Sequence, residues 1–202
     1  MKERPILFST EMVNAIICGL KIMTRRVLNK NTFKLLDAAA KAGEITSYYI
    51  DEKKIDDRDI RYILSLCPYG EPGDRLWIKE KFRIERPFIG NIDYDFTNNI
   101  IYYYATDHEK YRDNDKWKSS RFMPRWASRI NLEITNIRVE RLHDITEEDA
   151  RAEGANRINA GDLGMETYKS AFRRLWDSIN LKRGYGWYTN PWVWSIEFRR
   201  IV

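Results

Sequence analysis

The chain has 202 residues and a net charge of +5, and 43% of its residues are hydrophobic and 13% aromatic. This apolar content can form a packed core, which excludes a wholly disordered chain. No apolar run approaches the roughly 20 residues that span a bilayer, and the first residues lack the pattern of a secretory signal. We therefore expect a cytoplasmic protein with no membrane partner.

The first predicted elements are a strand over residues 5–9 and a helix over residues 9–19. Ser9 or Thr10 can accept a hydrogen bond from the first-turn amides, which is typical of a helix start. Gly19 is a typical stop at the carboxyl end of a helix. The sequence therefore predicts that the chain leaves this helix directly after Gly19.

The segment after this helix places a lysine, a threonine and two arginines within six residues. Lys21, Thr24, Arg25 and Arg26 are expected to lie on a strand or loop. One interpretation is a solvated basic turn in which Thr24 merely favours a strand. The other is a site for an anionic or nucleoside-like ligand. Composition and spacing alone leave both interpretations open.

The middle of the chain is predicted to mix an exposed excursion with strands. Residues 31–60 combine a helical stretch with a charge-dense stretch of mixed sign, so we expect an insertion outside the core. Residues 69–74 predict a turn, because proline and glycine occupy positions that suit chain reversal. Strands are expected over residues 75–84 and 98–106, where apolar residues recur.

The last third gives the clearest secondary-structure pattern. Residues 129–142 predict a strand with a bulge or bend near Thr135 and Asn136, where the apolar alternation slips by one residue. Thr146 is expected to cap a short helix. An amphipathic helix over residues 165–180 and a final strand over residues 191–201 complete the pattern.

These elements predict an α+β fold. Strands and helices do not alternate regularly, which argues against a doubly wound parallel sheet. A small mixed or antiparallel β-barrel with helices packed outside fits better. We expect a single domain over residues 1–202, with variable insertions near residues 31–60 and 85–120.

The cysteines and histidines give no pattern of metal ligands. Cys18 and Cys67 are far apart in the sequence, and His108 and His143 stand alone. No zinc site, metal site or other cofactor is therefore expected. Cys18 lies in the apolar run "AIICG", which predicts a buried side chain.

Most of the excess positive charge lies at the two ends of the chain. Residues 1–30 hold six Lys and Arg against two Glu, and residues 171–202 hold six against one Asp and one Glu. If the two ends meet in the fold, they form one positive face. Such a face favours an anionic partner, nucleic acid above all.

Five stretches in a fixed order resemble one known family. They are "PILFSTEMVNAIICGLKIMTRRV", "YGEPGDRLWIKE", "FMPRWASRINLEITNIRVERLHDITEEDARAEG", "FRRLWDSIN" and "NPWVWSIEF". The chain resembles the ASCH domain, a PUA-like β-barrel family related to RNA-binding modules, and most of all its phage- and prophage-encoded branch. The resemblance implies a PUA-like barrel, an RNA or nucleoside ligand, and a setting in the cytoplasm of a bacterial or phage-infected cell.

The resemblance also implies a catalytic set. One branch of the superfamily is a small amidohydrolase that removes the acetyl group from N(4)-acetylcytidine, using a K-x-x-T motif and a glutamate from a later short helix. Lys21 and Thr24 match the motif, and Glu153 stands at the matching later position. In this hypothesis Thr24 is the nucleophile, Lys21 with a depressed pKa is the base, and Glu153 orients the lysine or shuttles a proton.

Other residues are predicted to bind the ligand. Arg25 and Arg26 are the cations of the site. Glu80 is either a polar group at the pocket rim or an outward-facing strand residue. Trp126, Trp187 and Tyr188 lie near turn residues and can stack unpaired bases. The alternative for a tryptophan is a place in the core, which we expect for Trp176, Trp192 and Trp194.

The sequence thus predicts recognition of RNA or a modified nucleoside, with possible hydrolysis of an N-acyl group. The alternatives are a non-catalytic RNA-binding module and an ASCH-type ribonuclease. No prediction is made about the oligomeric state.

Overall fold

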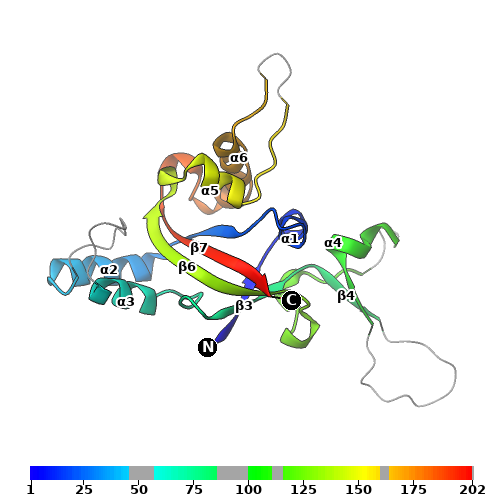
Figure 1. Cartoon of the computed structure of the whole chain (residues 1–202), viewed down its shortest axis with the longest axis horizontal. Coiled ribbons are helices and arrows are strands. Elements are labelled where there is room, and N and C mark those ends of the chain that lie inside the picture. The colour runs from blue at the N-terminus through cyan, green and yellow to red at the C-terminus, as the bar shows by residue number, and fades with distance from the viewer. Residues whose placement is uncertain (46–56, 86–99, 111–115, 160–163, 202) are drawn as a thin grey trace.

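The computed structural model describes residues 1–45, 57–85, 100–110, 116–159 and 164–201. These ranges contain one five-stranded sheet and a two-stranded sheet, with helices around them (Figure 1). The fold is therefore α+β, as the sequence predicts. Among the described residues, none of the helices has the length and apolar character needed to cross a lipid bilayer.

The large sheet is mixed. Its strands run in the order β1 (Glu3–Leu7), β3 (Arg75–Lys79), β6 (Asn131–Arg141), β7 (Trp192–Ile201) and β2 (Met23–Val27). Strands β1 and β3 pair in parallel, and the other neighbours pair antiparallel. The small sheet pairs β4 (Phe82–Glu85) with β5 (Ile100–Tyr103). The predicted strand over residues 75–84 is thus two strands in different sheets.

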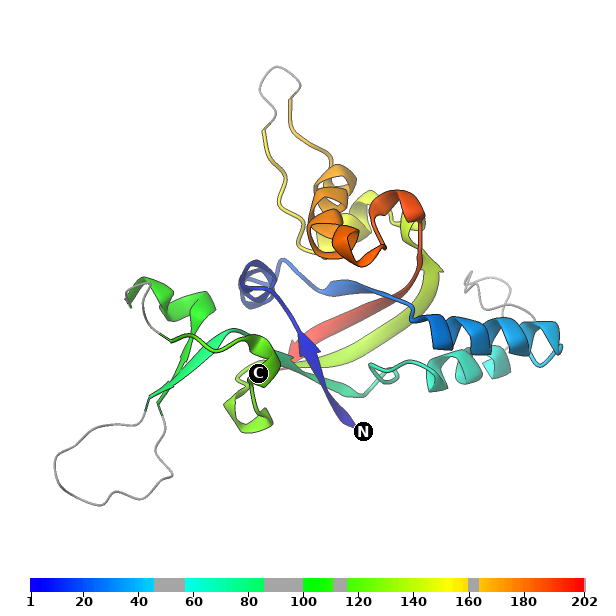
Figure 2. The same cartoon turned by 180° about the vertical axis from the view of Figure 1, so that it is seen from behind.

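The expected closed barrel is not seen among the described strands. The sheet curves, but its edge strands β1 and β2 share no backbone pairing (Figure 2). A side chain joins them instead, because Arg26 Nη2 on β2 donates a 2.7 Å hydrogen bond to the carbonyl oxygen of Leu7 on β1. The two edges therefore approach each other without closing into a barrel.

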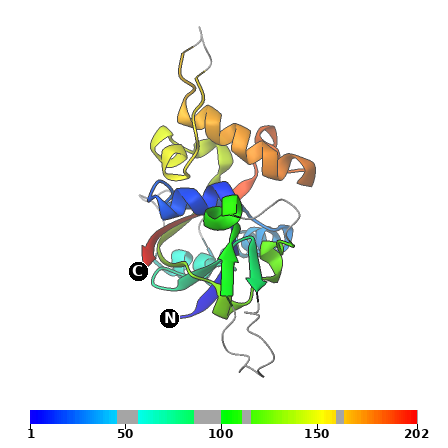
Figure 3. The ribbon, with the colours of Figure 1, turned by 90° about the vertical axis from the view of Figure 1, so that its right-hand side faces the viewer.

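Six helices lie around the sheet in the described ranges. They are α1 (Thr10–Ile17), α2 (Lys30–Lys41), α3 (Asp57–Ser65), α4 (Tyr104–Asp107), α5 (Glu147–Ala152) and α6 (Tyr168–Asn180). Helices α2 and α3 lie together at one end of the molecule, and α4 lies at the other end beside β4 (Figure 1). Helices α5 and α6 pack on each other above the curved sheet (Figure 3). Short 3-10 turns link the elements at His108–Lys110, Ser120–Phe122, Arg125–Ala127, Leu142–Asp144, Leu181–Arg183 and Trp187–Thr189.

The predicted helix ends are confirmed by the geometry. Ser9 caps α1 by accepting from Met12 N, and Thr146 caps α5 by accepting from Asp149 N. Gly19 follows α1 with φ of +71°, a left-handed conformation that side chains disfavour. The chain therefore turns sharply after α1 and leads through Lys21 into β2.

The predicted bulge in the long strand is also confirmed. The register between β6 and β7 shifts between Ile134 and Asn136, which leaves Thr135 as the extra residue. Side chains on either side of the bulge, Ile134 and Ile137, are both buried. The bulge therefore keeps the apolar face of β6 on the core through the slip in alternation.

The expectation that residues 31–60 lie outside the core is wrong for part of this range. Leu36 and Ala39 of α2 are 0% and 3% exposed, and Ile45 is 3% exposed. They join the main core with apolar residues of the sheet and with Ile63 of α3. The cause is amphipathicity, because α2 buries one stripe although its neighbouring sequence is densely charged. Residues 46–56 lie outside the described ranges, and the status of residues 31–60 and 85–120 as family insertions stays a prediction.

The prediction of a buried Cys18 is wrong. Helix α1 buries Val13 and Ile16, and Cys18 follows at the C-cap with an exposed side chain. Two residues correspond to about 200° around a helix, so Cys18 faces away from the side that Ile16 buries. The other cysteine, Cys67, is 5% exposed, and burial raises its pKa to about 11.

We therefore expect the two thiols to react very differently with an aromatic disulfide reagent at neutral pH. Cys18 should react in the folded protein, whereas Cys67 should react only after unfolding in urea, because a buried protonated thiol is a poor nucleophile. Counting released thiolate before and after adding urea measures this. A Cys18→Ser variant that still releases thiolate rapidly when folded would contradict the expectation.

Asp74 fastens the start of β1 to the turn before β3. Its carboxylate accepts from Lys2 N at 2.6 Å and from Arg4 Nη1 at 2.8 Å. The side chain is buried, which disfavours the charge, but these two hydrogen bonds outweigh burial and lower the pKa of Asp74 below its ordinary 3.8. Gly70 has φ of +116°, which side chains rarely adopt, and a β-carbon there would lie 2.8 Å from Asp74 Oδ2, so glycine is favoured beside this pair.

Asp74→Asn should lower the free energy of unfolding by about 1.5–3 kcal/mol at neutral pH, because charge-assisted hydrogen bonds are lost. The folded-state pKa lies below the unfolded value, so the contribution is present above pH 3.8 and is lost as the pH falls through the lowered pKa. Urea titrations of both proteins across this window measure the difference. A gap between the two proteins that widens on acidification would contradict this sign.

Candidate functional site

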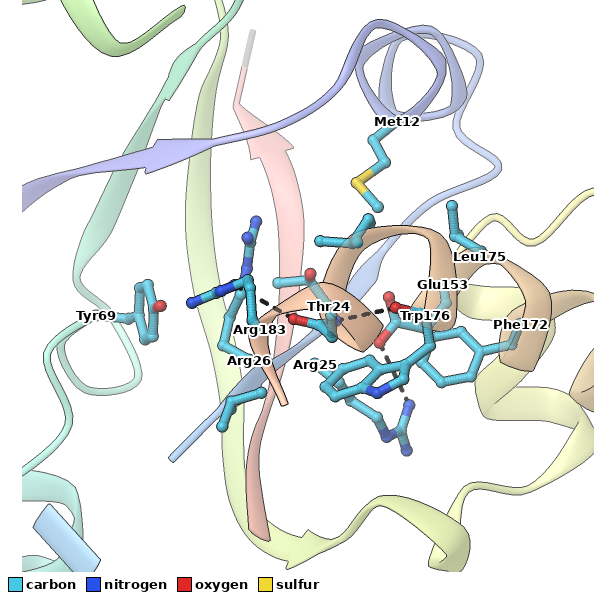
Figure 4. A pocket seen from close by; sticks show the side chains of 13 residues that line it. Met12, Thr24, Arg25, Arg26, Tyr69, Glu153, Phe172, Leu175, Trp176 and Arg183 are labelled. Carbon is cyan, nitrogen blue, oxygen red and sulfur yellow. Dashed lines mark hydrogen bonds and ion pairs between the residues drawn. The ribbon is translucent and has the colours of Figure 1, made fainter. Parts of the chain in front are cut away.

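A cavity of about 180 Å³ lies between β2, α5 and α6 (Figure 4). Strand β2 contributes Thr24, Arg25, Arg26 and Val27, and the end of α5 contributes Glu153. The other wall comes from α1, the turn before β3, α6 and the 3-10 turn after α6. It consists of Met12, Tyr69, Phe172, Leu175, Trp176, Ile179, Asn180 and Arg183.

Glu153 is held between two cations. Lys21 Nζ donates to Glu153 Oε2 at 2.7 Å and to the backbone oxygen of Glu153 at 2.7 Å. Arg25 Nη1 lies 3.5 Å from Glu153 Oε1. Both partners of the lysine pair are buried, with Lys21 at 1% and Glu153 at 2% exposure. An isolated antiparallel β-bridge between Lys21 and Glu153 also holds the backbones of these two residues together.

Burial shapes the charge of Lys21. Desolvation lowers the pKa of Lys21 below its ordinary value, and Arg26 and Arg25 lower it further, while Glu153 acts in the opposite direction. The direction agrees with the sequence-based hypothesis of a lysine with depressed pKa. Lys21 does not itself line the cavity. Its ammonium group contacts the carboxylate of Glu153, and Glu153 is the residue that lines the cavity.

Arg25 is the centre of a wider ion-pair network. Its Nη2 lies 2.6 Å from Glu140 Oε1 and 2.6 Å from Asp149 Oδ2. Burial disfavours its charge, but Glu153, Glu140 and Asp149 together raise its pKa. Arg138 lies on the outer side and pairs with Glu140, Asp149 and Glu197. Arg25 is therefore a fully paired cation that organises the cavity wall.

Thr24 points into the cavity with a free hydroxyl (Figure 4). The residue is 2% exposed, and within the described ranges its oxygen accepts or donates no hydrogen bond. Thr24 and Glu153 thus face the same space, but the hydroxyl is bonded neither to Glu153 nor to Lys21. The structure brings the three predicted catalytic residues to one place without linking all of them.

One end of the cavity is positive. Arg26 bonds to a carbonyl oxygen and lies over the ring of Phe8 at 5.0 Å, and its buried Nε has no partner among the described residues. Arg183 is exposed and donates to Asn180 Oδ1 at 3.2 Å. In the described part of the chain, neither guanidinium forms an ion pair. The Tyr69 phenol lies at this end, and burial raises its pKa.

The opposite wall is apolar and belongs to α6. Phe172 and Trp176 are buried, and Leu175 and Ile179 extend the same face toward solvent. Trp176 Nε1 donates to the backbone oxygen of Tyr185 at 2.7 Å, which fixes the indole in place. The cavity therefore joins an apolar, partly aromatic wall to a cationic end. No group of three or more metal-ligating side chains occurs in the described ranges.

Four predicted ligand residues lie elsewhere. Glu80 is 2% exposed and forms a two-point ion pair with Arg129 at 2.9 and 3.0 Å, so it is neither at this rim nor outward-facing. Trp126 and Tyr188 are 60% and 78% exposed. Trp187 is half-buried and packs against His143 and Phe172. Among the described residues, none of these four lines the cavity.

Sequence reasoning missed most of the α6 side of the cavity. It predicted an amphipathic helix over residues 165–180 with Trp176 in the core, and the apolar spacing of a helix does not distinguish a core from a cavity wall. The cationic end carried a usable signal, because the two ends of the chain were expected to form one positive face. Arg26 and Arg183 do meet at this cavity.

Comparison with known proteins finds a similarity among solved structures. The sequence matches none of the protein-family models and none of the curated proteins with which it was compared. Among solved structures it is similar to an ASCH domain from Lactobacillus crispatus JV V101, with 9% identity and a TM-score of 0.41. The match covers 98% of this chain and 79% of that chain. A likeness this weak carries no argument about the site.

Proposed function

We propose that the cavity binds one nucleotide unit of RNA, with a ring against α6 and a phosphate on Arg26 and Arg183. The observation that carries the proposal is the pairing of an aromatic wall with two guanidinium groups, of Arg26 and Arg183, that form no ion pair in the described chain. Arginine recognises phosphate through parallel hydrogen bonds, and aromatic faces stack unpaired bases. The resemblance of the sequence motifs to ASCH domains supports the same ligand class.

The size of the cavity agrees with a small unit. Pockets for drug-sized ligands measure roughly 300–1,000 Å³, whereas this cavity measures about 180 Å³. Only a group about as large as a nucleobase can be enclosed, and the sugar and phosphate then extend toward the exposed Arg183. A nucleotide held in this way keeps its backbone accessible to solvent.

Isothermal titration with nucleoside monophosphates tests the proposal. Ile179→Trp should block binding, because Ile179 lines the cavity and is 41% exposed at its edge. Ser178→Trp is the matched control, since this neighbour is exposed and lies outside the cavity lining. The proposal fails if no nucleotide binds the wild type, or if both variants bind as the wild type does.

Hydrolysis of an N-acyl group on the bound base is the second candidate function. The observation in its favour is that the free Thr24 hydroxyl and the Glu153 carboxylate face the same cavity. In this proposal Thr24 Oγ1 bonds to the acyl carbon while its proton passes to Glu153, which Lys21 holds in place. The C–N bond then breaks, the leaving amine takes the proton, and water hydrolyses the acyl-threonine. Thr24 has no hydrogen bond to Glu153 in this structure, so we rank hydrolysis second.

Mass spectrometry separates the two candidates. The protein is incubated at high concentration with N(4)-acetylcytidine and with short RNA carrying that base. Hydrolysis predicts loss of the acetyl group by the wild type and none by Thr24→Val, which removes a hydroxyl without a described partner and should fold normally. A wild type that binds the acetylated base and leaves it intact would reject hydrolysis and retain binding.

A further inference from the structure

We propose that a second hollow beside the cavity binds the adjoining nucleotides of a single-stranded nucleic acid, so that the ligand is a strand and not a free nucleotide. This inference rests on the proposed function of the first cavity. The hollow, called the α2 groove below, measures about 480 Å³. It is lined by Leu28, Lys30, Phe33, Lys34, Arg141, Tyr185, Pro191 and Trp192.

The charge of the α2 groove suits a phosphate backbone. Three of its lining residues are cations, namely Lys30, Lys34 and Arg141, and none of the described lining residues is a carboxylate. The two lysines are exposed on the first turns of α2, and in the described ranges neither forms an ion pair. Arg141 donates to the backbone oxygen of Asn190 at 3.0 Å, which leaves its charge without a carboxylate partner in the described chain.

The groove also offers aromatic faces. Phe33, Tyr185 and Trp192 line it, and Tyr185, which is partly exposed, is the side chain on which we place a stacked base. The Arg141 guanidinium lies 4.3 Å from the centre of the Trp192 ring, so this cation packs on an aromatic side chain of the groove wall. Aromatic side chains interleaved with cations are the usual surface for unpaired bases, which stack while the phosphates contact the cations. An apolar protein segment would leave the three cations without partners.

On two segments, residues close together in the sequence line the cavity and the groove. Val27 lines the cavity and Leu28, the next residue, lines the groove. On the facing segment, Arg183 lines the cavity and Tyr185 lines the groove. Leu28 N donates to Trp192 O at 2.9 Å, which holds the end of β2 against the start of β7 at the groove floor. In the proposed path, a strand leaves the cavity past Arg183 and enters the groove at Tyr185.

Fluorescence anisotropy with labelled hexanucleotides tests the inference. We expect single-stranded RNA hexamers to bind at least tenfold more tightly than the mononucleotide. Lys30→Gln with Lys34→Gln should remove most of that gain and leave mononucleotide binding unchanged. For single strands each lost phosphate contact reduces the slope of log K against log salt by about 0.7, so this variant should lower the slope by about 1.4. Tyr185→Leu should weaken hexamer binding without changing the slope, because stacking releases no counterions.

The control is Lys116→Gln with Lys118→Gln, which removes the same charge beside β4 at the other end of the molecule. The inference is overturned if hexamers bind no tighter than the mononucleotide, or if the control weakens them as much as the groove variant. It is also overturned if a duplex of the same sequence competes equally well, since stacking requires unpaired bases. A wild type that binds neither hexamer nor mononucleotide rejects the proposed function as well.

Discussion

Glu153→Ala is expected to lower the free energy of unfolding by about 3–5 kcal/mol, because it leaves buried charge without its partner. Lys21 Nζ would keep only the backbone oxygen of residue 153, and Arg25 would lose one of its three carboxylates. Neither cation can reach water without opening the packing, since Lys21 and Arg25 are 1% and 4% exposed. Urea titration followed by circular dichroism measures the loss.

The control is Glu148→Ala on the same helix. Glu148 is exposed in the first turn of α5, so its removal should cost no more than about 0.3–1 kcal/mol through the helix dipole. Adding Lys21→Met to Glu153→Ala should recover part of the stability, because the orphaned ammonium is then also removed. A Glu153→Ala variant as stable as the wild type would contradict the buried ion pair. So would a double variant whose loss of unfolding free energy equals the sum of the losses in the two single variants.

This expectation governs how activity data on Glu153 are interpreted. Loss of activity in a Glu153 variant can arise from unfolding as easily as from missing chemistry. Thr24 is the better probe of chemistry, because its hydroxyl faces the cavity without a described partner. Stability should therefore be measured for every Glu153 or Lys21 variant before its kinetics are interpreted.

Local features of the fold were predictable from the sequence because each depends on a few neighbouring residues. The caps at Ser9 and Thr146, the stop at Gly19 and the bulge at Thr135 all occur as predicted. The errors came from averaging over longer segments. Leu36 lies in a core stripe within a charged region, and Cys18 lies beyond the point where α1 stops being buried.

The site was predictable only in part, because its residues come from distant segments. Spacing alone could not connect Lys21 to Glu153, which are 132 positions apart, and the pair came from the family resemblance. The cavity wall of α6 depends on which side of the helix faces β2, and this is a tertiary property. In the sequence, Arg183 was counted only as one of the positive charges of residues 171–202. The fold shows that it lines the same cavity as Arg26.

Arg183→Glu is expected to weaken binding of cytidine monophosphate by about tenfold to a hundredfold and to leave binding of cytidine unchanged. The change removes hydrogen bonds to a charged group, which contribute about 1.5–3 kcal/mol, and it places a carboxylate beside Arg26. Folding should be preserved, because Arg183 is exposed and its described side-chain bond is the one to Asn180. Titration calorimetry with both ligands measures the two affinities.

Lys182→Glu supplies the matched control, since it makes the same change in net charge one residue away and outside the cavity lining. If both variants weaken the nucleotide equally, the effect comes from net charge and the phosphate is not bound at Arg183. If Arg183→Glu weakens cytidine as much as its monophosphate, the guanidinium contacts the nucleoside instead. Selective loss of the phosphate contribution is the result that places the phosphate between Arg26 and Arg183, because only there do two guanidinium groups of the cavity lack carboxylate partners in the described chain.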